Sequence, residues 1–424
     1  MSEYKLMWTS KNHGMFYHDA YFYQPYKKGY IKRYLGFIEK NTRCFYYNNN
    51  YYFYLDCEEL ALCKDGVERF YLSSRYEAYI KDVTKEINNA KRYRRLDIYS
   101  LSTSKLKTLL KTLLKRYEVA AALYTVSEPY YMDLLTRDIN IDIKDLKPYK
   151  MPSIIKEEKE WAEMVLNNEV NSKSISEHID RYSYLFNSFN SCGLTVDTLE
   201  KRLLNRNDLS KRYRTIKKAF KRRCNNGNLL LDRLSKTSYY RMELRPTWMA
   251  YSFLIDKILK KLYPNVNYIN YSVDEVLNEQ FDKREDRSEF YFFRENEVEK
   301  LFYNHTYRFN KKKNSLKLLK GQYGYGSKLC GIALVKQTPS FDENEISSGT
   351  VLVIPQLTYD YVPYLDKIKG IVVDEGGITS HANIIARELG ISIIVGTIDG
   401  TRLIKSGDYI NANMETYVIQ AGHK

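Results

Sequence analysis

Hydrophobic positions along the chain predict mixed structure at its start and helices through its middle. The runs Tyr51–Leu55 and Glu68–Leu72 are rich in aromatic residues and are bounded by turn residues, which predicts strands. After Ser102 or Ser104, leucines recur at helical spacing as far as Tyr117, which predicts a helix with a serine at its N-cap. We expect further helices over residues 156–168, 174–190, 195–206, 209–223 and 246–262.

The C-terminal part of the chain instead alternates strand and helix signals. Short apolar runs over residues 351–354, 370–374 and 391–395 predict buried strands. Around them we expect a short helix over 359–368, an amphipathic helix over 382–389, and two final strands after the turn at 406–408. This order of elements predicts a compact α/β unit.

Charge and tyrosine content divide the chain near the point where the pattern changes. The 424 residues carry a net charge of +15, but from Gly331 onward seven Lys and Arg oppose eleven Asp and Glu. That part therefore carries −4, and the first 330 residues carry +19 together with 36 of the 41 tyrosines. A composition break this sharp indicates a domain boundary, and the lysines and glycines just before it indicate a linker.

We therefore predict a multidomain α+β protein in which a largely helical N-terminal region precedes a compact unit. Its parts are a mixed α/β region over 1–100, a mostly helical region over 101–310, a linker over 311–330 and a β/β/α unit over 331–424. Hydrophobic residues make up 44% of the chain and charged residues 28%, which allows packed cores and excludes wholesale disorder.

The sequence points to a cytoplasmic location. Its apolar runs are far shorter than the roughly 20 residues that a membrane-spanning helix needs, and its first residues do not resemble a signal peptide. The six cysteines are scattered without Cys-x-x-Cys spacing, so neither a zinc site nor a disulfide framework is indicated. We expect lone thiols in a reducing compartment, and no membrane partner.

A strongly basic segment runs from Lys201 to Arg223. It holds eleven Lys and Arg and a single acidic residue, Asp208. Such a run can bind nucleic acid, form a solvated helix face, or dock an acidic surface. Because no helix-turn-helix, zinc-finger or RNA-binding signature accompanies it, nucleic acid is not the expected partner.

The residues that carry the chemistry lie where a glycine-rich turn meets a predicted helix. Gly376 and Gly377 let the backbone bend tightly and approach a ligand, and Thr379 or Ser380 can cap the helix. The unpaired N–H groups of a helix N-terminus favour anions, phosphate above all, and disfavour a protonated imidazole. His381 would then be a neutral nucleophile able to accept a phosphoryl group. The alternative is a solvated histidine that caps the helix.

The stretch from Asp374 to Ile391, DEGGITSHANIIARELGI, resembles the signature of the swivelling phosphohistidine, or mobile, domain of the phosphoenolpyruvate-utilising enzymes. This family includes pyruvate phosphate dikinase, phosphoenolpyruvate synthase and rifampicin phosphotransferase. The resemblance covers about the last hundred residues and implies that His381 becomes phosphorylated. Ser392 and Tyr359 stand where the family commonly has proline, and Asn383 where it commonly has alanine. Residues 1–310 are similar in order and pattern to the helical segment that precedes this domain in single-substrate members.

The resemblance also implies a division of labour, because these enzymes load the histidine at an ATP-grasp module and unload it at a second site. Residues 1–330 contain no G-x-x-x-x-G-K-[ST] motif, and 43 residues follow His381, whereas a phosphoenolpyruvate-binding barrel needs on the order of 250. We expect a separate ATP-grasp protein, with ATP and Mg²⁺, to phosphorylate His381, and no metal or tightly bound cofactor in this chain. The alternative is a non-catalytic regulatory or binding protein with a vestigial phosphohistidine domain.

The acceptor is expected to be a small molecule that binds in the helical region. Arg241 and Arg245 are four residues apart on a predicted helix with Glu243 nearby, which suits a clamp for a carboxylate or phosphate. An exposed cluster of ion pairs is an equally good interpretation.

Overall fold

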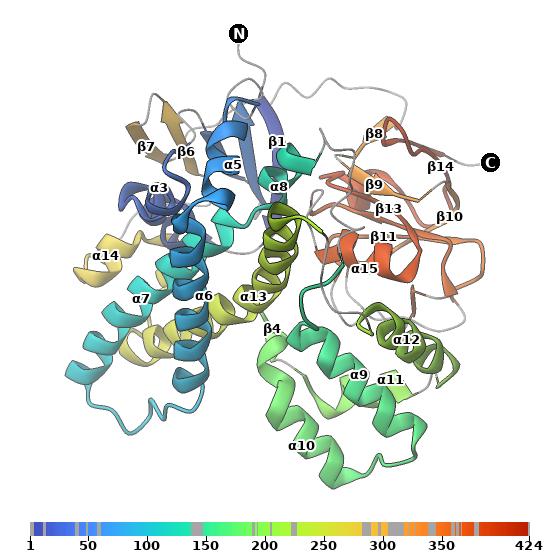
Figure 1. Cartoon of the computed structure of the whole chain (residues 1–424), viewed down its shortest axis with the longest axis horizontal. Coiled ribbons are helices and arrows are strands. Elements are labelled where there is room, and N and C mark those ends of the chain that lie inside the picture. The colour runs from blue at the N-terminus through green and yellow to red at the C-terminus, as the bar shows by residue number, and fades with distance from the viewer. Residues whose placement is uncertain are drawn as a thin grey trace.

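The structure is a computed structural model that describes most of the chain. The described residues are 4–11, 14–38, 42–47, 50–56, 61–136, 147–188, 191–192, 194–203, 206–221, 227–281, 290–295, 298–303, 318–321, 323–326, 328–337, 345–357, 361, 364–365, 367–376 and 381–422. Their architecture, helical in the N-terminal part with a mixed sheet at the C-terminus, agrees with the predicted α+β class (Figure 1).

One sheet joins the two ends of the N-terminal part. Its described strands are all antiparallel to their neighbours and lie in the order β1-β3-β2-β6-β7. They are β1 (Tyr4–Lys11), β2 (Thr42–Tyr47), β3 (Asn50–Asp56), β6 (Phe290–Glu295) and β7 (Val298–Tyr303). The sheet therefore crosses the boundary that we expected at residue 100, because β2 pairs with β3 on one side and with β6 on the other.

Most helices of the N-terminal part form two buried cores, and one of these cores includes residues of the sheet. These helices are α1 (Gly14–His18), the π-helix η1 (Asp19–Tyr23), α2 (Gln24–Lys27), α3 (Tyr30–Leu35), α5 (Lys64–Leu72), α6 (Ser74–Tyr93), α7 (Thr103–Val126), α8 (Pro129–Thr136), α13 (Leu229–Leu262), the 3-10 turn η4 (Tyr268–Asn270) and α14 (Val273–Leu277). Cys44, Phe53 and Leu55 of the sheet share a buried core with α3, α5 and α6. The predicted serine cap is confirmed, because the Ser102 side chain accepts from the Lys105 N–H at the start of α7.

Two expectations for these helices are wrong. The strand expected over Glu68–Leu72 is the second half of α5, where Val67, Phe70 and Tyr71 are buried at helical spacing. The helix expected from residue 246 begins at Leu229, after the N-cap Asn228. Proline commonly kinks or ends a helix, but α13 continues through Pro246 and packs against α6 and α7.

A smaller group of helices surrounds Trp161. It comprises α9 (Ser153–Leu166), α10 (Ser172–Tyr182), the 3-10 turn η3 (Ser183–Leu185), the short strands β4 (Asn187–Ser188) and β5 (Ser191–Cys192), α11 (Val196–Leu203) and α12 (Arg206–Ala219). Four of the predicted helices fall here, but the one expected over 174–190 ends at Tyr182. Trp161, Tyr182 and Leu199 form the buried core.

The C-terminal unit is built on a second sheet, drawn in orange to red in Figure 1. Its described strands lie in the order β8-β15-β14-β10-β11-β12-β13-β9, and β10 to β13 are parallel. They are β8 (Leu318–Lys320), β9 (Tyr323–Tyr325), β10 (Leu329–Val335), β11 (Thr350–Ile354), β12 (Gly370–Val373), β13 (Ser392–Val395), β14 (Tyr409–Asn413) and β15 (Val418–Gly422), with helices α15 (His381–Leu389) and α16 (Gly400–Leu403).

The strands predicted in this unit are confirmed, as is the helix over 382–389. Every residue of β11 and β12 is buried, because apolar cores lie on both faces of the sheet. The linker expected over 311–330 is too long, since β8, β9 and the start of β10 belong to the sheet. The short helix expected over 359–368 falls partly outside the described residues.

Candidate functional site

The predicted phosphate site lies where β12 leads into α15. Gly376 is buried and has φ +107°, a backbone conformation that favours glycine. The helix begins at His381, and its apolar face, which includes Ala382, Ile385 and Ala386, packs on the sheet. The backbone of His381 is therefore at a helix N-terminus, as the motif predicts. Gly377, Thr379 and Ser380 lie outside the described residues, as does the side chain of His381.

Buried polar side chains gather at this end of the sheet. Asp374 and Glu375 follow β12, Asn383 lies in the first turn of α15, and Thr397 follows β13; each is at most 6% exposed. β12 and β13 are parallel neighbours, so their carboxyl ends lie side by side. Ligands of open parallel sheets bind at such an edge. Sequence analysis singled out the glycines and the histidine but missed Thr397, for which the motif gave no signal.

Two residues of the predicted substrate clamp on α13, Arg241 and Glu243, contact different partners inside the protein. Arg241 is 8% exposed; its Nη2 lies 3.1 Å from Glu128 Oε1, and its guanidinium stacks 3.7 Å from the Tyr124 ring centre. Glu243 accepts hydrogen bonds from the N–H (2.6 Å) and hydroxyl (2.8 Å) of Ser153, at the start of α9.

Arg245, the third residue of the clamp, is half-buried on the same helix. Arg241 forms a buried ion pair rather than the exposed cluster that was the alternative interpretation. Arg241 and Glu243 thus bind different parts of the protein, and a role for the three residues in substrate binding stays a prediction.

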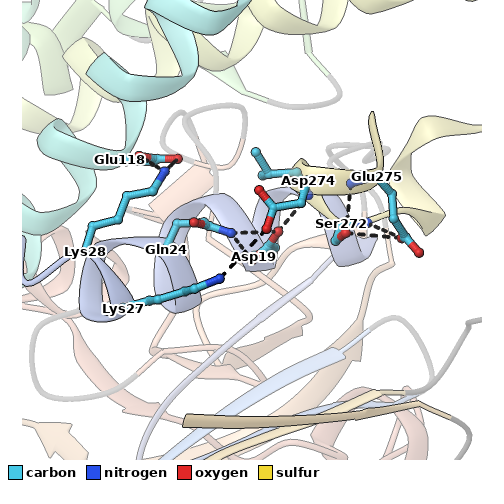
Figure 2. Close-up of polar contacts among 9 residues, drawn as sticks. Asp19, Gln24, Lys27, Lys28, Glu118, Ser272, Asp274 and Glu275 are labelled. Carbon is cyan, nitrogen blue, oxygen red and sulfur yellow. Dashed lines mark hydrogen bonds and ion pairs between the residues drawn. The ribbon is translucent and has the colours of Figure 1, made fainter. Parts of the chain in front are cut away.

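A second polar cluster, which sequence analysis missed, surrounds the π-helix η1 (Figure 2). Asp19 is 2% exposed; its carboxylate accepts from the Gln24 side chain at 3.2 and 3.4 Å and from the Val273 N–H at 2.7 Å. Beside it, Lys28 Nζ lies 2.7 Å from the buried Glu118 carboxylate. Burial raises the pKa of Asp19 to about 7, although the bound N–H groups oppose the shift.

The Asp19 contacts fasten the start of α14 to η1, two elements separated by about 250 residues of sequence. π-helical segments are rare and often occur at functional positions. No hydrophobic pattern distinguishes a π-helix from an α-helix over five residues, so the sequence carried no signal for this cluster.

The described part of the basic segment forms the end of α11, α12 and the two residues after α12. On α12, Ile216 is buried, and the Tyr213 hydroxyl donates to Glu163 of α9 at 2.7 Å. Lys217, Lys218 and Lys221 are exposed, so this helix presents positive charge to solvent. That exposure suits a docking surface and equally a solvated face.

Among the described residues, no helix has the length and apolarity needed to cross a membrane. Within the same residues, His, Cys, Asp and Glu side chains nowhere gather in groups of three or more that would hold a metal ion.

Comparison with known proteins identifies the C-terminal unit. Residues 346–416 match the family model of the PEP-utilising enzyme mobile domain. A probable phosphoenolpyruvate synthase of Staphylothermus marinus is 44% identical over 93 residues, which are 22% of this chain and 11% of the relative. A probable phosphoenolpyruvate synthase of Pyrococcus horikoshii is 42% identical over 86 residues, 20% and 10% of the two chains.

A pyruvate kinase of Sporosarcina psychrophila is 40% identical over 77 residues, which are 18% of this chain and 13% of the relative. The chain thus spans only about a tenth of the length of these relatives. The resemblance inferred from the sequence is confirmed: the C-terminal unit is a mobile domain of the PEP-utilising type.

Proposed function

We propose that this chain is a phosphotransferase component that carries a phosphoryl group on His381 and passes it to a small-molecule acceptor. The observation that carries the proposal is the DEGGITSHA sequence, in which the mobile-domain signature coincides with the carboxyl end of a parallel strand and the first residue of α15. The relatives named as phosphoenolpyruvate synthases match only about a fifth of this chain, and we propose that the whole chain is likewise a phosphotransferase.

The chemistry follows from a nucleophilic imidazole at a helix N-terminus. A ring nitrogen of His381 attacks phosphorus in the donor, an N–P bond forms, and the bond from phosphorus to the leaving oxygen breaks. The helix N-terminus and the backbone N–H groups of the glycine-rich turn would stabilise the charge on the transferring group. In the second step an acceptor oxygen attacks phosphorus, the N–P bond breaks, and the imidazole is released.

The donor site is proposed to lie on a separate ATP-grasp protein that binds ATP and Mg²⁺. Residues 1–330 contain no G-x-x-x-x-G-K-[ST] motif and no other phosphate-gripping glycine loop in the sequence. The helical N-terminal part is proposed to bind the acceptor. Arg245 is its best candidate contact, because Arg241 and Glu243 already have internal partners.

Loading in trans is testable with purified chains. ATP and Mg²⁺ should phosphorylate the chain only when a candidate ATP-grasp protein is present, and not when His381 is replaced by alanine. Phosphohistidine is detected by mass spectrometry of peptides kept at alkaline pH. Labelling of the chain by ATP alone would contradict the trans mechanism. Failure with every ATP-grasp protein of the source genome would favour the alternative of a vestigial, non-catalytic domain.

A further inference from the structure

The side chain of Asp374, at the exit of β12, is hydrogen-bonded to the segment that follows β13. Its carboxylate accepts from the Thr397 hydroxyl at 2.9 Å and from the Thr401 N–H at 3.1 Å to each oxygen. The Thr401 hydroxyl also donates to it. Asp374 is 2% exposed. These donors belong to the turn after β13 and to the start of α16. A buried charge therefore holds the exit of β12 against the segment that follows the neighbouring strand.

The backbone of this turn is shaped around the carboxylate. A Cβ added at Gly400 would lie 2.7 Å from Asp374 Oδ1 and 2.6 Å from Thr397 Oγ1, closer than real Cβ contacts come. Ile398 has φ +68°, which is a strained conformation for a β-branched residue, and its N–H donates to the Asp374 carbonyl at 3.1 Å. Strain of this kind persists only where the surroundings hold it in place, and it concentrates at functional sites.

The exit of β12 is fastened on its other side as well. The Glu375 N–H donates to the Pro355 carbonyl at 3.0 Å, just beyond the end of β11. The next residue, Gly376, opens the glycine-rich turn, and α15 starts five residues later at His381. The exit of β12 is therefore hydrogen-bonded to both neighbouring strand ends, and the chain continues from it to His381.

We propose that Asp374 is a positioning residue for phosphoryl transfer at His381. It acts through the backbone: its carboxylate holds the exit of β12, as far as Gly376, against the segment after β13, and thereby fixes the strand end from which the chain leads to α15. The inference rests on the proposed function. A misplacement of about 1 Å at a reacting centre can lower a rate about a hundredfold, so a distant carboxylate can matter without touching phosphate.

The test uses the full chain and potassium phosphoramidate, a small donor that needs no partner protein. An imidazole nitrogen attacks its phosphorus, the P–N bond to the amine breaks, and ammonia leaves. The rate of labelling at His381 is measured against phosphoramidate concentration for wild type, Asp374→Asn, Thr401→Val and Thr401→Ser. Asp408→Asn is the matched control, since Asp408 is also fully buried and accepts the Lys405 N–H (2.9 Å) at the turn before β14.

We expect Asp374→Asn to lower the labelling efficiency at least tenfold, mainly through a lower maximal labelling rate. Thr401→Val should lower it less, whereas Thr401→Ser and Asp408→Asn should stay within twofold of wild type. A labelling efficiency at His381 that is the same in Asp374→Asn as in wild type would overturn the proposal. So would equal losses in Asp374→Asn and Asp408→Asn, because that result would indicate a loss of stability alone.

Hydrogen exchange separates this inference from the proposed function. The peptide that follows Asp374 should lose protection in Asp374→Asn and keep it in Asp408→Asn, whether or not His381 is labelled. Unchanged protection in Asp374→Asn would overturn the positioning role. If Asp374→Asn loses this protection but the wild-type chain is never labelled at His381, the result would contradict the proposed function and leave the positioning role intact.

Discussion

The two large sheets of this protein differ in how their strands come together. The C-terminal sheet has a parallel centre in which β11, β12 and β13 follow one another in sequence and are buried on both faces. The N-terminal sheet is antiparallel, and β2 pairs with β6 across more than 240 residues of sequence. In β2, Thr42 and Cys44, two positions apart, are both buried. Parallel strands buried on both faces produce continuous apolar runs that are easy to recognise in the sequence, whereas the antiparallel strands of the N-terminal sheet do not.

The two parts of the chain also differ in where they place their polar and charged residues. In the C-terminal sheet, the motif with His381 occupies the carboxyl end of a parallel strand, where open sheets bind ligands. The N-terminal part instead pairs two buried carboxylates with cations from distant parts of the sequence, Glu128 with Arg241 and Glu118 with Lys28. We infer that the local motif carries the transferable chemistry, and that the acceptor specificity depends on long-range packing.

Core truncations in the two sheets give the largest expected effect. Ile371→Ala in β12 and Phe53→Ala in β3 each remove a side chain that is at most 2% exposed. The first should cost about 2–5 kcal/mol of unfolding free energy and the second about 3–5 kcal/mol. If the two sheets belong to separately folding units, each variant should lower one of two thermal transitions, measured by calorimetry. A single transition lowered by both variants would contradict their independence.

Asp19 gives a smaller effect that depends on pH. Its pKa is raised to about 7 in the folded protein, so the folded state binds more protons than the unfolded state between about pH 4 and pH 7. The contribution of Asp19 to stability therefore falls as pH rises through that window. Asp19→Asn removes this titration. The unfolding free energy of the variant relative to wild type should therefore rise by on the order of 2–4 kcal/mol between pH 5 and pH 8.

The measurement for Asp19 is urea unfolding at several pH values. The exposed Asp180, replaced by asparagine, is the control and should show no such trend. A constant difference between wild type and Asp19→Asn across the range would mean that the carboxylate is ionised throughout.

Charge reversal on α12 should give the smallest effect. If this helix docks the loaded C-terminal unit or the acidic face of a partner, replacing Lys217, Lys218 and Lys221 with glutamate should slow the loading of His381 by ATP and the ATP-grasp protein about two- to tenfold at low salt. Lys105, Lys111 and Lys115 on α7 are also exposed and provide a control with the same change in net charge. Equal rates for the two triple variants would contradict docking at α12.

The sequence was most informative where structure is local. The strands over 351–354, 370–374 and 391–395, the helix after His381 and the serine cap of α7 depend on neighbours within a few residues, so propensity and spacing predicted them. The pairing of β2 with β6 has no local signal. Nor does the helical state of Glu68–Leu72, where packing overrides strand propensity.

The candidate site follows the same rule. His381 and Gly376 were predicted because a short motif defines them, whereas the contacts of Asp374 with Thr397 and Thr401 join residues more than twenty positions apart. Likewise, Arg241 and Glu243 were grouped with Arg245 in a clamp on one helix, but they bind Glu128 and Ser153, which only the tertiary structure brings near. Spacing identified which residues are polar and close, but it did not reveal their partners.

The central claim is that His381 carries the phosphoryl group, and site mapping of the phosphorylated chain tests it most directly. After incubation with ATP, Mg²⁺ and the ATP-grasp protein, the peptide that contains His381 should carry a phosphate that is stable to alkali and lost in acid. His381→Ala should abolish it, and replacement of the buried His178 should not. A phosphate that persists in His381→Ala, or that maps to another residue, would contradict the account.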